Sequence, residues 1–288
     1  ETKNIRLAPA VSLMQLRDPL KVAEDYALVD QLSGGRVDMG VAKGFVPHEF
    51  DAFHIDQSEV PDRIAEGLDI CQKFWAGAPF AHEGKFFKFE KLDPWPPAVN
   101  GALPIWTAAS NSKDSFINAA DQGFHLMMNH YPMSAEAVKE KFAWYCERWE
   151  SAGRKTADRK GMIAFMAHIA DTEEQAIEEA KAALQEHAGA FGKVMRGQQW
   201  DRDYEGDISV LLHMCEDDDW RDVFRRRTLI CSPEQAAERI QHYLDMGWTE
   251  ISFITRYAGL TNEQNMTTIR RISEEVLPML GLSANAAA

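Results

Sequence analysis

A short turn carries the residue types that bind an anion. Ser110, Ser112 and Lys113 lie in the segment 109–113, between the end of a predicted strand and the start of a predicted helix. The first backbone N–H groups of a helix have no partner within the helix, and the helix dipole favours negative charge beside them. Two hydroxyl donors and one ammonium group add to this preference. The turn is therefore a candidate site for a phosphate group.

Lys43 adds a second cation at the end of another predicted strand, 36–41. Both lysines can reach one phosphate if the two strand ends lie at the same edge of a sheet. Gly44 permits close backbone approach to a ligand, and Phe45 can line a flat ring. The alternative is that Ser110 only caps a helix, that both lysines are ordinary surface residues, and that Phe45 belongs to the core.

Other polar residues lie at or just beyond predicted strand ends without forming a metal motif. Four of them are candidate substrate-binding residues: His48, His130, Tyr131 and Arg256. His168 lies in the middle of a predicted strand, where a core histidine with satisfied ring nitrogens is expected. His82-Glu83 lacks the second histidine four residues on that a zinc protease needs. The nine histidines therefore predict no metal site.

Strands and helices alternate along the chain. Asp18-Pro19 predicts a helix start and Gly34-Gly35 its end. The predicted strands are 4–11, 36–41, 103–108, 124–128, 162–170 and 250–257, and a hairpin is predicted for 80–89; the predicted helices cover 20–32, 61–75, 112–121, 134–151, 233–246 and 262–280, and one more opens at Asp171. Such alternation implies parallel strands, in a doubly wound sheet or a (β/α)₈ barrel.

The segment 190–230 breaks this rhythm, because it is polar and rich in glycine and aspartate. We expect an insertion or lid within the domain, or an oligomer contact. The plainer alternative is a solvated helical face.

Composition excludes several classes of protein. The 288 residues carry a formal net charge of −14, which disfavours nucleic acid as a partner. No apolar run is long enough to span a membrane, and no secretory signal opens the chain. The four cysteines show no CxxC spacing, so a reducing cytoplasm is the expected location. Motifs for serine hydrolases, P-loop NTPases and classical dinucleotide binding are absent from the sequence.

The segment 30–45, DQLSGGRVDMGVAKGF, resembles the signature of the bacterial luciferase-like flavin monooxygenases. Further matches follow in family order: Arg63 and Glu66, the run 104–110 (PIWTAAS), Ala119-Ala120 with Gly123, and the run 230–234 (ICSPE) with Met246-Gly247. A common family version has glycine where Cys231 stands. The resemblance covers nearly the whole chain.

The resemblance implies one (β/α)₈ TIM barrel domain over residues 1–288. It aligns residues 4–11 with the family's third strand, so the first two strand–helix units are expected to be absent from this chain. Those units often supply a catalytic histidine, so no catalytic residue can be assigned. Either a separate polypeptide carries the missing strands, or the chain is truncated or a degenerate relative.

The resemblance also implies a two-component monooxygenase. Reduced FMN, supplied by a separate NAD(P)H:flavin reductase, and O₂ would oxygenate a small organic substrate of unknown identity. The flavin-binding candidates are Lys43, Gly44, Phe45, Arg63, Ala109, Ser110 and Lys113, although a helix–helix salt bridge explains Arg63 equally well. A homodimer is expected from the family.

Two rival hypotheses stay open within the same superfamily. One is a deazaflavin-dependent oxidoreductase that transfers hydride, and the other is a non-catalytic flavin-binding barrel subunit. An unrelated barrel aldolase or isomerase would need a strand lysine or paired carboxylates, which the sequence does not offer.

Overall fold

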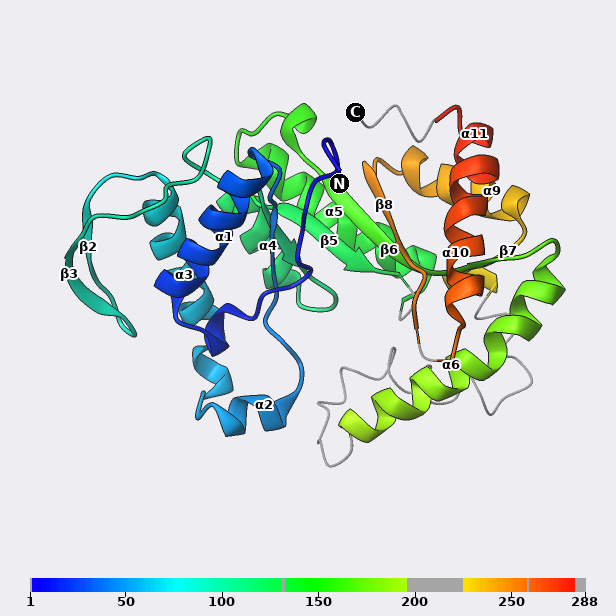
Figure 1. Cartoon of the computed structure of the whole chain (residues 1–288), viewed down its shortest axis with the longest axis horizontal. Helices are drawn as coiled ribbons and strands as arrows, with labels where there is room; N and C mark the ends of the chain where they lie inside the picture. Colours follow the sequence, from blue (N-terminus) through cyan, green and yellow to red (C-terminus); the bar gives the residue numbers. More distant parts are fainter. Residues whose placement is uncertain (1, 131–132, 196–224, 258, 283–288) are drawn as a thin grey trace. The chain divides into compact units, whose positions relative to one another are not determined.

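The computed structural model describes residues 2–130, 133–195, 225–257 and 259–282 (Figure 1). The chain divides into two compact units, residues 1–109 and residues 110–288. Each unit contains parallel strands and helices, so the predicted α/β class is confirmed. A single domain over residues 1–288 stays a prediction.

The first unit alternates helices and strands and carries one hairpin. Its elements are η1 (Met14–Leu16), α1 (Pro19–Ser33), β1 (Met39–Val41), α2 (Pro47–Ala52), η2 (Gln57–Glu59), α3 (Val60–Trp75), β2 (Phe80–Glu83), β3 (Lys88–Leu92) and β4 (Ile105–Ala108).

Helix α1 begins and ends where the sequence predicts. The Asp18 carboxylate accepts hydrogen bonds from the backbone N–H groups of Leu20 at 2.9 Å and Lys21 at 3.1 Å. Pro19 occupies the first helical position, where its missing N–H costs nothing. Gly34, at φ 73°, ends the helix in the left-handed conformation that glycine adopts without a Cβ clash.

Both aspartates of the segment 30–45 hold the fold together. The buried Asp30 carboxylate accepts hydrogen bonds from the N–H groups of Val37 at 3.3 Å and Val99 at 2.9 Å. The Asp38 carboxylate accepts from the Trp106 indole at 3.3 Å and pairs with Arg6. These contacts fix the path from α1 into β1, so this part of the family signature is structural.

The predicted strand over residues 4–11 is wrong as a continuous strand. Only two isolated parallel bridges form here, from Leu7 to Val37 just before β1, and from Ser12, one residue beyond the segment, to Val41 at the end of β1. Between these bridges the chain forms no ladder with β1, and the Ala10–Val11 peptide bond is cis. β1 itself pairs in parallel with β4. The carboxyl ends of the segment and of both strands therefore meet at one edge of this unit.

The predicted hairpin is confirmed, with β2 and β3 antiparallel. Glu66 of α3 holds its turn, because its carboxylate accepts backbone N–H groups of residues 85–87 at 2.9 to 3.1 Å. His82 Nε2 lies 3.0 Å from the same carboxylate. A Cβ on Gly84 would overlap Glu66 Oε1, so a larger residue here would displace the carboxylate from the turn.

The second unit also alternates strands and helices. Its elements are α4 (Lys113–Gln122), β5 (His125–Asn129), α5 (Ala135–Ser151), η3 (Thr156–Asp158), β6 (Gly161–Ile169), α6 (Glu173–Met195), β7 (Leu229–Cys231), α9 (Pro233–Asp245), β8 (Glu250–Ile254), α10 (Asn262–Arg271), the π-helical turn η5 (Ile272–Val276) and α11 (Leu277–Met279).

Strand β6 is the centre of this unit. Its first half pairs with β5 and β8, and its last three residues, 167–169, pair with β7, all in parallel. Most of β6 is buried. The predicted strands at 124–128, 162–170 and 250–257 are confirmed to within a few residues, whereas β7 was not predicted.

The predicted helices of this unit are confirmed as well. Gly123 ends α4, and a capping box of Ser232 and Gln235 begins α9. The helix predicted over 262–280 has the expected extent, but a π-helical turn interrupts it.

The predicted insertion over residues 190–230 is only partly covered by the structure. Its first six residues continue α6, and residues 229 and 230 belong to β7. Residues 196–224 lie outside the described part of the chain. The insertion or lid therefore stays a prediction.

Among the described residues, no helix combines the length and apolar character needed to cross a membrane.

Candidate functional site

The turn after β1 holds three of the predicted flavin-binding residues. Lys43 is exposed, and its Nζ makes no hydrogen bond or ion pair with any described residue. Gly44 has φ 72°, and Phe45 is 52% exposed. His48, in α2 just beyond the turn, is exposed too. The structure therefore brings Lys43, Gly44 and Phe45 together on one turn at the carboxyl edge of the first unit, with His48 nearby in the sequence.

Gln15 fastens this turn to the chain before α1. Its Nε2 donates a hydrogen bond to the Lys43 carbonyl at 2.8 Å, while its buried Oε1 has no partner in the described structure. A Cβ on Gly44 would lie 3.3 Å from Gln15 Nε2 and from Phe50 Cζ. The turn therefore holds a tightly packed glycine, and a buried acceptor without a described partner lies beside it. Buried polar atoms normally have a partner, so a water molecule or a ligand donor could satisfy this one.

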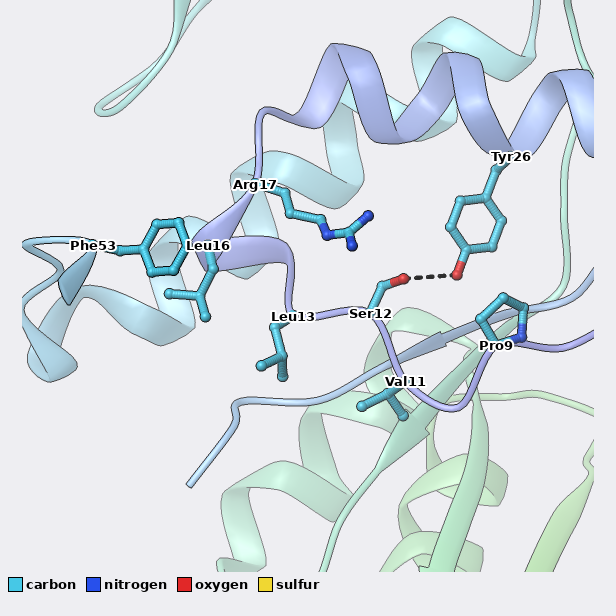
Figure 2. Close-up of a pocket in the computed structure, with 8 residues that line it drawn as sticks. All are labelled: Pro9, Val11, Ser12, Leu13, Leu16, Arg17, Tyr26 and Phe53. Atoms are coloured by element: carbon cyan, nitrogen blue, oxygen red, sulfur yellow. Dashed lines mark hydrogen bonds between the residues drawn. The ribbon is translucent and has the colours of Figure 1, made fainter. Parts of the chain in front are cut away.

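A cavity of about 490 Å³ lies in the same unit (Figure 2). Six of its lining residues come from the chain between Leu7 and α1, one from α1, and one from directly after α2: Pro9, Val11, Ser12, Leu13, Leu16, Arg17, Tyr26 and Phe53. Leu13 connects the cavity to the turn, because a Cβ on Gly44 would lie 3.4 Å from Leu13 Cδ2. The cavity therefore adjoins the turn at 43–45.

The polar part of this cavity is small. Ser12 Oγ and Tyr26 OH share a hydrogen bond of 2.8 Å, and burial raises the pKa of the Tyr26 hydroxyl, which stays protonated. Arg17 is exposed, and its guanidinium has no hydrogen bond or ion pair with any described residue. Sequence reasoning missed all three residues. Position was the available signal for two of them, because Ser12 and Arg17 follow a strand-like segment at the edge where ligands bind in α/β proteins. Tyr26 lies on α1, and no local signal indicates its role.

Arg63 is occupied by other contacts. Its guanidinium pairs at 2.9 Å with Glu59, the last residue of η2, which directly precedes α3, and lies 4.2 Å from the centroid of the Phe86 ring. An ion pair occupies the guanidinium, as in the alternative interpretation, but its partner directly precedes the same helix and does not lie on a second α-helix. A flavin contact by Arg63 stays a prediction.

The predicted anion-binding turn spans the end of the first unit and the start of the second. Ala109 is buried, whereas Ser110 is exposed. The N-cap of α4 is Ser112, and no side-chain cap bond forms there. Lys113 Nζ lies 5.3 Å from the centroid of the Trp144 ring. The α4 terminus thus lacks a side-chain cap, so an external acceptor could satisfy its N–H groups.

His130 is fully buried in the second unit, not exposed at a strand end. Its Nδ1 lies 3.0 Å from the Arg227 carbonyl, which only accepts, so Nδ1 carries the proton. Its Nε2 then accepts from the Tyr243 hydroxyl, and its ring stacks on Phe165 with centroids 5.0 Å apart. Burial lowers the pKa of His130 to about 4, so the ring is neutral at pH 7. A substrate contact by His130 stays a prediction.

The remaining predicted substrate-binding residues are Arg256 and Tyr131. Arg256 is exposed two residues beyond β8, and Tyr131 lies outside the described residues. His168 is a satisfied core residue, as predicted, since Nε2 lies 2.8 Å from the Glu179 carboxylate and Nδ1 lies 3.3 Å from Thr268 Oγ1.

No group of three or more histidine, cysteine or acidic side chains suited to a metal ion occurs among the described residues. Burial raises the pKa of the Cys71 and Cys231 thiols to about 12, so neither is a thiolate at pH 7.

A family model described as luciferase-like monooxygenase matches residues 1–250. The chain belongs to this family. The match includes both the turn at 43–45 and the turn at 109–113, which confirms the resemblance found in the sequence.

Individual relatives agree with this assignment. The chain is 24% identical to the oxygenase component of the flavin-dependent trigonelline monooxygenase of Acinetobacter baylyi, across 96% of this chain and 77% of that protein. The fold is similar to that of the oxygenating constituent of 3,6-diketocamphane monooxygenase from Pseudomonas putida in complex with FMN, with a TM-score of 0.74, 23% identity, and coverage of 98% and 81%. It is also similar to the coenzyme F420 dependent tetrahydromethanopterin reductase of Methanopyrus kandleri, with a TM-score of 0.71, 17% identity, and coverage of 95% and 83%. Relatives of this kind are flavin-dependent monooxygenases and oxidoreductases.

The residues of the first unit suit a flavin. A flavin ring presents N–H donors and carbonyl acceptors, and its ribityl chain ends in a phosphate. The unpartnered Gln15 Oε1 can accept from a ring N–H, and Lys43 can meet an anionic group. Gly44 lets the backbone come close, because a Cβ there would crowd Phe50 and Gln15.

Proposed function

We propose that the chain is the oxygenase component of a two-component monooxygenase that uses reduced FMN and O₂ to oxygenate a small organic substrate. A separate NAD(P)H:flavin reductase would supply the reduced FMN. The observation that carries the proposal is the family match over residues 1–250. The mixed apolar and polar cavity beside the turn at 43–45 supports it. A luciferase-like (β/α)₈ barrel is proposed with it, and the similar folds of the solved relatives support this architecture.

The chain's own residues then have distinct tasks. When bound, reduced flavin supplies the electrons that activate O₂. Gln15 and the Lys43–Phe45 turn would orient the ring. Ser110 and Lys113 of the second unit remain proposed phosphate-binding residues in their own right. Leu13, Leu16 and the other apolar lining residues would exclude water from the substrate. Binding roles for Arg63, Ala109, His48, His130, Tyr131 and Arg256 remain part of the proposal, as does a homodimer.

A deazaflavin-dependent oxidoreductase is the second candidate. It is favoured by the likeness in fold to the coenzyme F420 dependent reductase. Such an enzyme would transfer hydride and need no O₂, so the cofactor that binds distinguishes the two candidates.

The decisive experiment is an anaerobic titration of the purified chain with reduced FMN and, in parallel, with a reduced deazaflavin. We expect saturable binding of FMN, followed by incorporation of one atom of labelled O₂ into an organic product. Binding of the deazaflavin alone would select the second candidate. Absence of binding by either cofactor would overturn both.

A glycine pair gives the titration a matched control. Gly44 and Gly101 both have positive φ, but only Gly44 is closely surrounded, whereas nothing lies within 4 Å of a Cβ on Gly101. Gly44→Ala is expected to weaken FMN binding by roughly tenfold or more, while Gly101→Ala leaves it unchanged. Equal effects of the two variants would show that the turn at 43–45 does not hold the flavin.

A further inference from the structure

The cavity of Figure 2 is divided into a polar end and an apolar remainder. Arg17, Ser12 and Tyr26 form the polar end, and Figure 2 shows the guanidinium and both hydroxyls directed toward the same space. The other lining residues are aliphatic, aromatic or proline: Pro9, Val11, Leu13, Leu16 and Phe53. A ligand that fills this space is therefore mainly apolar with one polar end.

One hydroxyl proton of the Ser12–Tyr26 pair is not used in a hydrogen bond within the described part of the protein. Ser12 and Tyr26 carry two hydroxyl protons, and the 2.8 Å hydrogen bond between them uses one. The second proton has no acceptor among the described residues and is available to an acceptor in the cavity. Tyr26 is only 8% exposed, so a ligand acceptor would contribute more there than water does at the surface.

The charge of the polar end is positive. Arg17 has no acidic partner in the described structure, although Asp18 follows it directly. Asp18 is committed elsewhere, since its Oδ1 accepts from Leu20 and Lys21 at the start of α1. A guanidinium with planar N–H donors and no carboxylate partner matches a carboxylate ligand in both charge and geometry.

A doubly charged phosphate fits this end less well. The cavity offers one guanidinium and one spare hydroxyl proton, and the neighbouring helix N-terminus is already capped by a carboxylate. Its N–H groups therefore cannot serve a phosphate as open helix termini do. The guanidinium and the hydroxyl proton together suit a small planar group with one negative charge.

We propose that this cavity binds a small carboxylate-bearing organic molecule, with its carboxylate on Arg17 and the Ser12–Tyr26 pair and its apolar body against Leu13, Leu16 and Phe53. The inference rests on the proposed function in one respect, because the bound carboxylate would be the molecule that is oxygenated. It names the substrate class as an apolar monocarboxylate.

Two isosteric probes test the inference without any flavin. Cyclohexanecarboxylate and the neutral cyclohexanecarboxamide are titrated separately into the full chain by calorimetry. We expect the carboxylate to bind roughly tenfold more tightly than the amide, as one charge-assisted contact provides. Comparable affinities, or no binding of either probe at millimolar concentration to chain shown folded by circular dichroism, would overturn the proposal.

Charge variants locate the effect. Arg17→Gln is expected to abolish the preference for the carboxylate over the amide, and Arg17→Lys to restore part of it. Lys3→Gln also removes one positive charge, but from a residue that precedes the Leu7 bridge and does not line the cavity, and it is expected to keep the preference. A preference that survives Arg17→Gln, or inorganic phosphate that competes as well as the carboxylate, contradicts the assignment.

The outcome is independent of the flavin titration. Carboxylate binding without FMN binding would remove the proposed function and keep the cavity assignment. FMN binding without a carboxylate preference would keep the proposed function and remove the cavity assignment.

Discussion

Glu66 and Arg17 are both charged residues of the first unit, and their surroundings differ completely. The Glu66 carboxylate accepts three backbone N–H groups of the hairpin turn and faces His82. The Arg17 guanidinium lines a cavity and has no partner in the described structure. A charge whose hydrogen-bonding capacity is filled by the protein holds structure, whereas one left unfilled beside a cavity can bind a ligand.

The same contrast separates other candidates. His130 and His168 use both ring nitrogens inside the second unit. Gln15 and Lys43 have atoms without partners among the described residues. On this criterion the first unit's carboxyl edge is the more promising place for a ligand, and the buried histidines stabilise the fold.

The largest expected effect concerns Glu66. Glu66→Ala is expected to lower the free energy of unfolding by roughly 3 kcal/mol, because it leaves several backbone N–H groups without their charged acceptor. Urea denaturation measures the change. Glu90→Ala, an exposed carboxylate on the same hairpin, is the control and should shift stability by less than about 0.5 kcal/mol. If both variants lower the free energy of unfolding equally, Glu66 does not anchor the hairpin turn.

Lowering the pH should weaken the second unit through His130. Burial lowers the pKa of His130 from 6.5 to about 4 in the folded chain. The unfolded chain therefore takes up this proton first, and stability is lost as the pH falls from 6.5 toward 4. Between pH 7 and pH 5 the expected loss, measured by urea denaturation at each pH, is about 2 kcal/mol. His130→Gln should reduce this pH dependence, and His48→Gln, which removes an exposed histidine, should not.

Tyr243→Phe should have a smaller effect. It removes the hydroxyl that donates to His130 Nε2 and leaves that buried nitrogen unpaired, so a loss of roughly 1 to 1.5 kcal/mol is expected. Thermal unfolding at pH 7 measures it. No change in stability would mean that the ring nitrogen finds another donor, and His130 would then not count as fully satisfied by the protein.

Arg17→Gln should have the smallest effect on folding. An exposed side chain without a partner contributes little, so the free energy of unfolding should change by less than about 0.5 kcal/mol. Urea denaturation of the variant without ligand checks this. A large loss would place Arg17 with Glu66 among the structural charges and would count against the proposed binding role.

Local signals in the sequence predicted most elements, because their causes are local. Asp18-Pro19 and Gly34 determine the ends of α1 through contacts within a few residues. Strand β7, with three residues, was missed because it is too short for a pattern. Residues 4–11 form a single bridge, at Leu7, where a full strand was expected.

The candidate site was harder to predict. Lys43 to Phe45 form a turn at a strand end, as expected from a local motif. The cavity depends on Tyr26 from α1 meeting Ser12, fourteen residues earlier, and no local pattern encodes that contact. The burial of His130 depends on Arg227 and Tyr243, about a hundred residues away in sequence.

Strand β6 has a consequence for how the second unit opens. Three strands pair with this one strand, and Ile163 and Ala167 on it are fully buried. Its amide hydrogens can exchange with solvent only when neighbouring strands detach, so they report on the opening of the whole unit. β5, β7 and β8 can each fray alone. Amide exchange should therefore be slowest along β6, which makes that strand the last part of the unit to lose its structure.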